Sequence, residues 1–227
     1  MQKHNVPVII LVAPQLAVNV GMIARVMLNF SFSELRIVTP RDKDVINNAL
    51  AASAGADCIL KNSKIFDSLK EAVSDLNIVY ATSKRMRYLN KPVNNLFNVF
   101  SNSELLKENY SSQKRGFLFG KEASGLSNND LNYANILITI DTNTNFSSLN
   151  LVQAVALLCY EWVRSKSTIL NLNDNKLDSE QIESNKITTK RLLTKSLKKT
   201  KLKVAATFND LEYFFNYLET QLTNKQF

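Results

Sequence analysis

Three short clusters of polar residues have types and spacing that suit chemistry on a bound ligand. The first is Asn19-Val20-Gly21, followed by Arg25 in the same stretch. A guanidinium can bind a phosphate group through two parallel hydrogen bonds, so Arg25 is a candidate anion-binding residue. The alternative is that Asn19 caps a helix and that Arg25 is solvated.

The second cluster runs from Phe119 to Leu126, directly after an expected strand. Its sequence is Phe-Gly-Lys-Glu-Ala-Ser-Gly-Leu, with Glu122 between Gly120 and Gly125. Two glycines this close predict a tight loop at the carboxyl end of a strand, the edge at which open α/β sheets bind ligands. The alternative is an ordinary connection between a strand and a helix.

The third cluster, 146–154, places Ser147, Ser148 and Asn150 just before a long apolar stretch. Ser147 suits a helix cap, which is its simplest interpretation. Asn150 is a poor helix former, so its amide is expected to have a role other than helix propensity.

Other catalytic and binding classes are excluded by what the sequence lacks. His4 is the only histidine and has no candidate partner, which excludes a Ser-His-Asp triad and a His-rich metal site. Cys58 and Cys159 form no CxxC motif and are interpreted as reduced, buried thiols of a cytoplasmic protein. No Walker loop or G-x-G-x-x-G motif follows the first strand. No signal peptide, membrane span or metal site is expected.

Strand and helix patterns alternate through the first 165 residues. This alternation predicts an α/β fold, with a parallel sheet covered by helices on both faces. The expected strands are 6–13, 35–38, 77–81, 115–119 and 136–140, and the expected helices are 19–29, 45–52, 65–74, 104–108, 128–133 and 149–163.

The last third of the chain has a different amino-acid composition. We expect a core domain at 1–165, a polar and basic linker at 166–203, and an amphipathic helix within 204–227. Residues 184–203 hold eight basic residues and no acidic one, and the whole chain carries a net charge of +8. The excess of charge suits a polyanionic partner, although the Lys content of an AT-rich genome also explains part of it. The helix carries an apolar stripe that we expect to dock on the core or on a second subunit: Phe208, Leu211, Phe214, Phe215, Leu218 and Leu222.

Taken together and in this order, the three clusters resemble the SpoU/TrmH class of the SPOUT RNA methyltransferases. Within that class they are most similar to the TrmJ branch, which consists of tRNA 2′-O-ribose methyltransferases. Thr82-Ser83 after a strand matches a cofactor-contact segment of the class, and the resemblance covers residues 5–165. The chain departs from the pattern at Asp141, where a Pro is usual, and at Ser31, where a Gly is common.

The resemblance implies a fold, an assembly and a reaction. The fold has a trefoil knot in the carboxyl-terminal part of the sheet, and the active site lies near the interface of a homodimer. The reaction transfers a methyl group from S-adenosylmethionine to a ribose 2′-hydroxyl of tRNA, on cytidine or uridine at anticodon-loop nucleotide 32. The alternatives are ribosomal RNA, another tRNA nucleotide, a non-catalytic RNA-binding relative, or an enzyme acting on a small nucleotide.

The resemblance also implies roles for individual residues. Arg25 either activates the 2′-hydroxyl or binds the adjacent phosphate. The second role is the alternative because the high pKa of arginine makes it a weak base. Asn19 and Asn150 orient the Arg and the ribose, Ser148 contacts substrate or cofactor, and Glu122 supports Arg25 as an ion pair. The positions that match the cofactor-binding residues are Thr82, Ser83, Lys84, Gly120, Ile140, Ser147, Ser148 and Leu149.

Overall fold

The computed structural model describes residues 6–84, 91–101, 113–182 and 205–224 of the chain. In these ranges a parallel sheet of seven strands has the order β3-β2-β1-β6-β4-β7-β5. The strands are β1 Val8–Val12, β2 Leu35–Val38, β3 Lys64–Phe66, β4 Ile78–Thr82, β5 Val93–Asn95, β6 Arg115–Phe119 and β7 Ile136–Thr139. The helices are α1 Ala17–Asn29, α2 Val45–Ser53, α3 Asp57–Lys61, α4 Leu69–Val73, α5 Leu96–Ser101, α6 Asn128–Asn132, α7 Leu151–Ile182 and α8 Phe208–Asn224.

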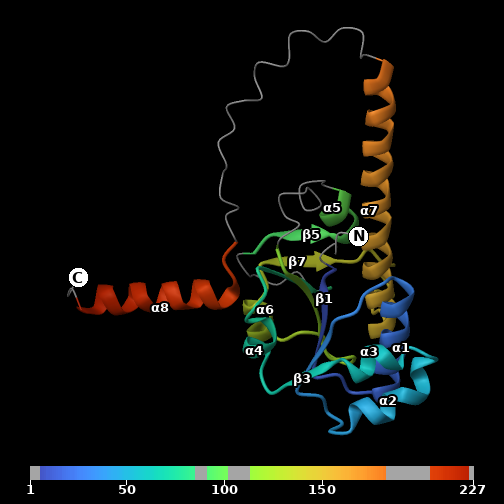
Figure 1. Ribbon diagram of the computed structural model, residues 1–227. Helices are drawn as coiled ribbons and strands as arrows, with labels where there is room; N and C mark the ends of the chain where they lie inside the picture. The colour runs from blue at the N-terminus through green and yellow to red at the C-terminus, as the bar shows by residue number, and fades with distance from the viewer. Residues whose placement is uncertain (1–5, 85–90, 102–112, 183–204, 225–227) are drawn as a thin grey trace.

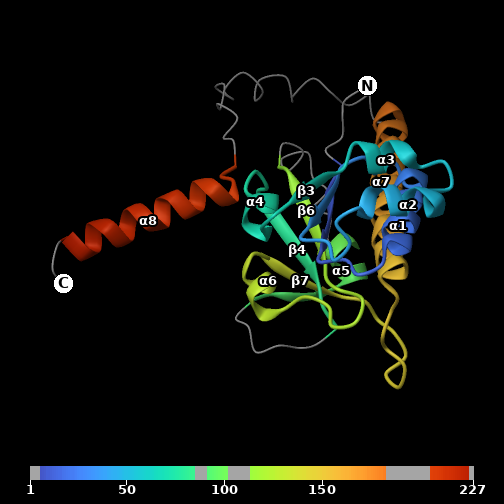
Figure 2. The ribbon, with the colours of Figure 1, turned by 90° about the horizontal axis from the view of Figure 1, so that it is seen from below.

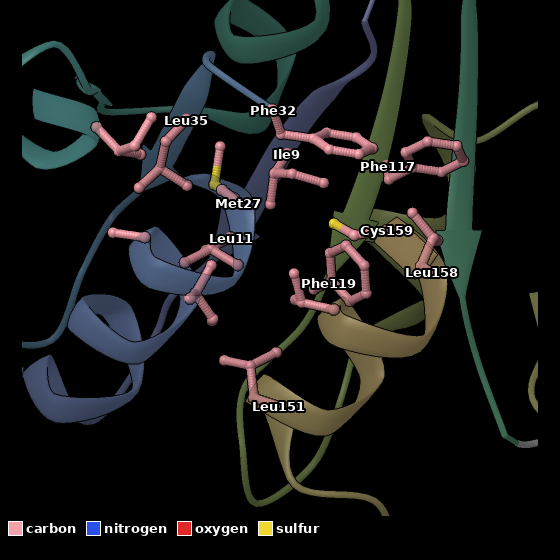
Figure 3. Packing of buried hydrophobic residues seen from close by; sticks show 14 of the residues in the cluster. Ile9, Leu11, Met27, Phe32, Leu35, Phe117, Phe119, Leu151, Leu158 and Cys159 are labelled. Carbon is pink, nitrogen blue, oxygen red and sulfur yellow. The ribbon is translucent and has the colours of Figure 1, made fainter. Parts of the chain in front are cut away.

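Both faces of the sheet are buried, which confirms the expected α/β class. Along β1, Ile9 and Leu11 point into one apolar cluster, whereas Val8 and Ile10 point into the other. Successive side chains of a strand point to opposite faces, so a strand covered on both sides needs an unbroken apolar run. Figure 3 shows the first cluster, in which side chains of β1, β2 and β6 meet those of α1 and α7.

The helices form two layers of unequal size. Helices α1, α2, α3, α5 and α7 pack on one face of the sheet, and α4 and α6 pack on the other (Figure 2). Gly21 lets α1 approach α2 closely, because a Cβ at this position would lie 2.2 Å from the carbonyl oxygen of Ala49. The glycine of the first cluster is therefore a helix-packing residue.

Two local expectations were wrong, and a third is not tested. Residues 65–74 were expected as one helix, but Ile65 and Phe66 pair with Ile37 and Val38 of β2 before α4 begins. The strand forms because a neighbouring strand edge satisfies its backbone groups, which outweighs the local helical pattern. Helix α7 continues to Ile182, beyond its expected end at residue 163. The expected helix at 104–108 lies outside the described residues.

The two cysteines differ, so the expectation that both are buried holds for only one. Cys159 is buried in α7, and burial raises the pKa of its thiol to about 12. Cys58 is exposed in α3, whose apolar side is formed instead by Ile59 and Leu60.

Helix α8 docks on the rest of the described chain through its first five residues, and Glu212 forms an ion pair with Lys70 of α4 at 2.7 Å. The backbone N–H of Phe208 donates to the carbonyl of Leu76, and the Phe208 ring lies 5.5 Å from that of Tyr133. The helix then leads away from the sheet (Figure 1), and Phe214 and Phe215 are more than half exposed. Docking of the remaining stripe on a second subunit stays a prediction.

No helix in the described ranges is long and apolar enough to cross a membrane. The trefoil knot stays a prediction of the resemblance.

Ser31 follows α1, at the position where the resemblance led us to expect a Gly. It adopts φ of 60°. This left-handed conformation favours glycine, which explains the preference at this position.

Candidate active site

A cleft of about 380 Å³ opens at the carboxyl ends of β4, β6 and β7. It brings together all eight positions that were expected to hold the cofactor, from three separate loops, together with Glu122. The lining residues are Thr82, Ser83, Lys84, Phe119, Gly120, Lys121, Glu122, Ala123, Ser124, Gly125, Leu126, Ile138, Ile140, Ser147, Ser148, Leu149, Leu151 and Ala154.

Parallel pairing explains why these loops meet. Strand β4 lies between β6 and β7, so all three strands end at the same edge of the sheet. Two further hydrogen bonds extend the alignment past the strand ends. The Thr82 hydroxyl donates to the carbonyl of Leu118 at 3.1 Å, and the Ser83 N–H donates to that of Ile138 at 2.9 Å. The segment 82–84 is therefore held against the cleft.

The loop after β6 closes on itself and forms one wall of the cleft. The N–H of Gly125 donates to the carbonyl of Lys121 at 2.8 Å, and Gly125 adopts φ of 69°. A Cβ on Gly120 would lie 2.2 Å from the carbonyl carbon of Gly125 and from the nitrogen of Leu126. Gly120 is therefore required by the fold of its own loop, in addition to any approach of a ligand.

Glu122 joins this loop to the segment that leads into α1. Its carboxylate accepts hydrogen bonds from the backbone N–H groups of Gln15 and Leu16, at 2.8 and 3.2 Å, and from Nδ2 of Asn19 at 2.9 Å. In return, the Gln15 side-chain oxygen accepts a hydrogen bond from the N–H of Ala123 at 3.2 Å. Partial burial by itself raises the pKa of Glu122, but these hydrogen bonds outweigh it and hold the pKa below its usual value.

Asn19 has a different role from helix capping. It lies inside α1 and is buried, and the residue that precedes the helix is Leu16, whose side chain makes no cap hydrogen bond. The Asn19 amide binds Glu122 instead. A buried asparagine within a helix indicates that its amide has a hydrogen-bond partner. Here the partner lies 103 positions away, so the local sequence does not identify it.

Arg25 lies outside the cleft of its own chain. It is exposed on α1, does not line the cleft, and forms no ion pair with Glu122 in the described part of the chain. The expectation that Glu122 supports Arg25 directly is therefore wrong within one chain, because the carboxylate is already bound by Asn19 and two backbone amides. Met22, one turn earlier, and Val18, two turns earlier on the same face, are also exposed.

Asn150 caps α7. Its Oδ1 accepts a hydrogen bond from the N–H of Val152 at 2.7 Å, and its own N–H donates to Oε1 of Gln153 at 3.0 Å. This reciprocal pair is the usual capping arrangement at the start of a helix. Ser147, which the sequence suggested as the cap, lines the cleft with Ser148.

Sequence reasoning missed several residues of the site. Gln15 was not singled out, although its backbone and side chain both bind the loop after β6. Lys121 and Ser124 line the cleft, and their position between Gly120 and Gly125 was the signal that could have identified them. Asp141 accepts a hydrogen bond from the Asn95 side chain, which ties the loop after β7 to the end of β5.

The chemistry of the cleft is that of a site for a polar organic ligand. Hydroxyl groups and backbone amides lie beside apolar walls from Phe119, Leu126 and Ile138. No group of three His, Cys, Asp or Glu side chains that could hold a metal ion occurs in the described residues.

Comparison with known proteins agrees with this arrangement. Residues 7–160 match the model of the SpoU rRNA Methylase family. The chain is 38% identical over 180 residues to the tRNA (cytidine-2′-O-)-methyltransferase TrmJ of Methanocaldococcus jannaschii, which is 76% of each chain. It is 35% identical over 158 residues to the tRNA (cytidine/uridine-2′-O-)-methyltransferase TrmJ of Sodalis glossinidius, covering 70% of this chain and 60% of that one.

Among solved structures, the crystal structure of TrmJ from Z. mobilis superimposes with a TM-score of 0.64 at 38% identity. The superposition covers 78% of this chain and 82% of that one. The family match spans the three clusters and the strands that position them. The chain belongs to the SpoU rRNA methylase family and is an RNA methyltransferase.

Proposed function

We propose that this chain transfers a methyl group from S-adenosylmethionine to the ribose 2′-hydroxyl of cytidine or uridine in tRNA, at anticodon-loop nucleotide 32. The observation that carries the proposal is the cleft, which gathers the eight expected cofactor positions from three loops. The tRNA and its pyrimidine nucleosides come from the names of the TrmJ relatives, and nucleotide 32 comes from the resemblance.

The cleft suits S-adenosylmethionine in size and chemistry. Its volume of about 380 Å³ lies within the range of roughly 300–1,000 Å³ that is usual for ligand pockets. The apolar side chains of Leu126 and Ile138 suit a purine ring, and the hydroxyl groups of Thr82, Ser83 and Ser147 suit its polar substituents. When bound, the cofactor supplies a sulfonium methyl group whose transfer needs no metal ion.

The residues of the chain then have to prepare the acceptor. A ribose hydroxyl is a weak nucleophile, and its oxygen must be held in line at about 3 Å from the methyl carbon. A guanidinium with a pKa above about 12 is a weak base, so Arg25 suits the binding of the adjacent phosphate and the stabilisation of a developing alkoxide. Proton transfer to Arg25 is the alternative role.

A second subunit would bring Arg25 to the cleft. Arg25 is exposed between the apolar residues Val18, Met22 and Leu28 of α1, and Leu157 and Tyr160 are exposed on the neighbouring helix α7. Such a contiguous apolar face around a charged residue is typical of a protein interface. A two-fold dimer across α1 and α7 would bury this face and place each Arg25 near the cleft of its partner.

The direct test is incubation of the protein with unmodified tRNA and methyl-labelled S-adenosylmethionine, followed by nuclease digestion and mass spectrometry. We expect the label on 2′-O-methylcytidine or 2′-O-methyluridine within the fragment that contains nucleotide 32. Label on a base, on another tRNA nucleotide, or only on ribosomal RNA would contradict the proposal. A Gly120→Ala protein serves as the control that lacks an intact cleft.

A further inference from the structure

Phe146 is the most exposed large apolar side chain in the described part of the chain, with 79% of its surface accessible. It lies in the loop between β7 and α7, immediately before Ser147 and Ser148, which line the cleft. Consecutive Cα atoms are about 4 Å apart, so the backbone of Phe146 lies next to a residue of the cleft wall. An aromatic ring left in water at the edge of a binding site is available to a ligand.

The loop holds Phe146 in a defined position despite this exposure. The Phe146 N–H donates to the carbonyl of Asn143 at 3.1 Å, and the Asn145 N–H donates to the Asn143 side-chain oxygen at 2.9 Å. Across the loop, the Thr142 hydroxyl donates to the carbonyl of Ser147 at 3.4 Å. These hydrogen bonds order the backbone that carries the ring, which lowers the entropy that the loop loses on binding.

The loop that carries the ring is otherwise polar. Phe146 is the one exposed large apolar side chain of the described segment 141–150, whose other members are mainly Asp, Thr, Asn and Ser residues. Lys84 and Lys121 line the cleft and are exposed. Two acidic groups at this edge have partners: Glu122 is bound to Asn19, and Asp141 is bound to Asn95.

An exposed ring on a loop that adjoins a cleft lined by exposed Lys84 and Lys121 matches the chemistry of single-stranded nucleic acid. Its bases stack on aromatic side chains while its phosphates bind Lys. A protein partner would instead require a larger apolar area around the ring. We propose that Phe146 is a stacking platform for an unpaired nucleobase of the acceptor loop, beside the ribose that is methylated. This inference rests on the proposed function.

Stacking has a consequence for specificity. Every base has a π-face, so a stacking contact tolerates different bases, whereas hydrogen bonds to base edges discriminate between them. Phe146 would therefore hold an unpaired cytidine or uridine equally well. It acts on the affinity for RNA and not on the affinity for the cofactor.

The test compares four proteins in binding to a labelled RNA stem-loop that carries the anticodon arm, measured by fluorescence anisotropy. Phe146→Ala is expected to weaken RNA binding by about 5- to 150-fold, which corresponds to about 1–3 kcal/mol for one stacked base. Phe146→Leu, which keeps an apolar side chain without a ring, is expected to lose a similar factor, and Phe146→Tyr is expected to keep the affinity. Affinity for S-adenosylhomocysteine, measured by calorimetry, is expected to be unchanged in all of them.

Tyr213→Ala is the matched control. Tyr213 is 76% exposed on α8, and this helix is anchored next to Leu76, at the edge of the sheet opposite to the cleft. We expect this variant to bind RNA as the wild type does. The comparison separates the loss of a particular ring from the loss of any exposed aromatic side chain.

Two results would overturn the inference. If Phe146→Leu keeps the RNA affinity, the ring does not stack. If Phe146→Ala turns a dimer into a monomer in sedimentation experiments, the residue is a subunit contact. The proposed function fails separately, when the wild-type protein neither binds nor methylates tRNA. If the wild type does both and Phe146→Ala does both equally well, only the inference about Phe146 fails.

Discussion

The Glu122 carboxylate and the Asn19 side-chain amide form a hydrogen bond of 2.9 Å across 103 positions of the sequence. Glu122 belongs to a wall of the cleft, and Asn19 belongs to the helix that carries Arg25. The bond therefore connects the expected cofactor site to the helix expected to bind the acceptor. Gln15 strengthens this connection, because it contacts both Glu122 and Ala123.

A double-mutant cycle measures this connection. Asn19→Ala, Glu122→Ala and the double variant are expected to show a coupling energy of about 1–2 kcal/mol in urea unfolding, because hydrogen bonds to charged groups are stronger than neutral ones. Asn47 and Asp44 form a similar bond of 2.7 Å on the surface. The same cycle on Asn47 and Asp44 is expected to give a coupling energy of less than about 1 kcal/mol. If the effects of the Asn19 and Glu122 substitutions on stability are additive, the two side chains are not coupled and the connection is contradicted.

Substitutions at the two glycines of the cleft loop are expected to differ. Gly120→Ala would place a Cβ 2.2 Å from the backbone of Gly125 and Leu126, so the loop must shift. We expect affinity for S-adenosylhomocysteine to fall at least about tenfold, or about 1.4 kcal/mol. Gly125 has open space but φ of 69°, so Gly125→Ala is expected to cost about 1 kcal/mol of stability with a smaller loss of affinity. If calorimetry shows that both variants bind S-adenosylhomocysteine with equal affinity, the two glycines do not differ in this way.

Arg25→Ala is expected to separate methyl transfer from cofactor binding. Because Arg25 does not line the cleft, affinity for S-adenosylhomocysteine should stay the same, while methyl transfer falls by about 10²- to 10⁴-fold. A variant that retains more than about a tenth of the rate would show that Arg25 has no such role.

Mixed dimers determine whether Arg25 acts on the partner's cleft. A dimer of one Arg25→Ala chain and one Gly120→Ala chain would contain one site with an intact cleft and an intact arginine from the other chain. We therefore expect co-expressed, tandem-tagged mixed dimers to regain methyl transfer that neither homodimer has. If the arginine acts within its own chain, the mixed dimer stays inactive.

A partly buried ion network is expected to make stability depend on pH. Arg36 is buried and binds both Glu34 and Asp75, and Lys114 binds the same two carboxylates. Partial burial by itself raises the pKa of Asp75, but the hydrogen bonds from Arg36 and Lys114 outweigh it and hold the pKa far below its usual value. The pKa of Glu34 is also lowered, since the attraction of Arg36 and Lys114 outweighs partial burial.

Lowered carboxyl pKa values stabilise the folded protein above the pKa of the unfolded chain, about 4. That stability is expected to be complete above about pH 5 and to be lost as the pH falls through the lower pKa values of the folded protein. Urea unfolding between pH 7 and pH 3 measures it. Asp75→Asn is expected to be less stable at pH 7 and to have a shallower pH dependence, and an unchanged slope would show that the network does not contribute.

The basic residues of 184–203 lie outside the described residues, and their contact with the tRNA backbone stays a prediction. Replacing Lys195, Lys198, Lys199 and Lys201 by Gln is expected to weaken tRNA binding and to make its salt dependence shallower, by up to about 0.9 in the logarithmic slope for each lost phosphate contact. Affinity for S-adenosylhomocysteine is the control and should not change. Unchanged tRNA affinity and slope would identify the segment as a solvated linker.

The sequence alone determined the class of fold and most of the cleft. Unbroken apolar runs such as residues 8–12 predict strands buried on both faces, and parallel strands bring the loops at their carboxyl ends to one edge. The family resemblance assigned Thr82, Gly120 and Ser147 to one site, and the three loops that carry them line one cleft. Sheet geometry leaves little choice about where loops after parallel strands go.

Only the tertiary structure decided which partner each polar side chain has. Asn19 looked like a cap and Asn150 like a ligand-binding amide, yet Asn19 binds Glu122 and Asn150 caps α7. Ile65 and Phe66 had a helical pattern, yet the exposed edge of β2 makes them a strand. Hydrogen-bond partners such as Gln15 and Ala123, which lie 108 positions apart, meet only when the sheet has formed, so local periodicity carries no information about them.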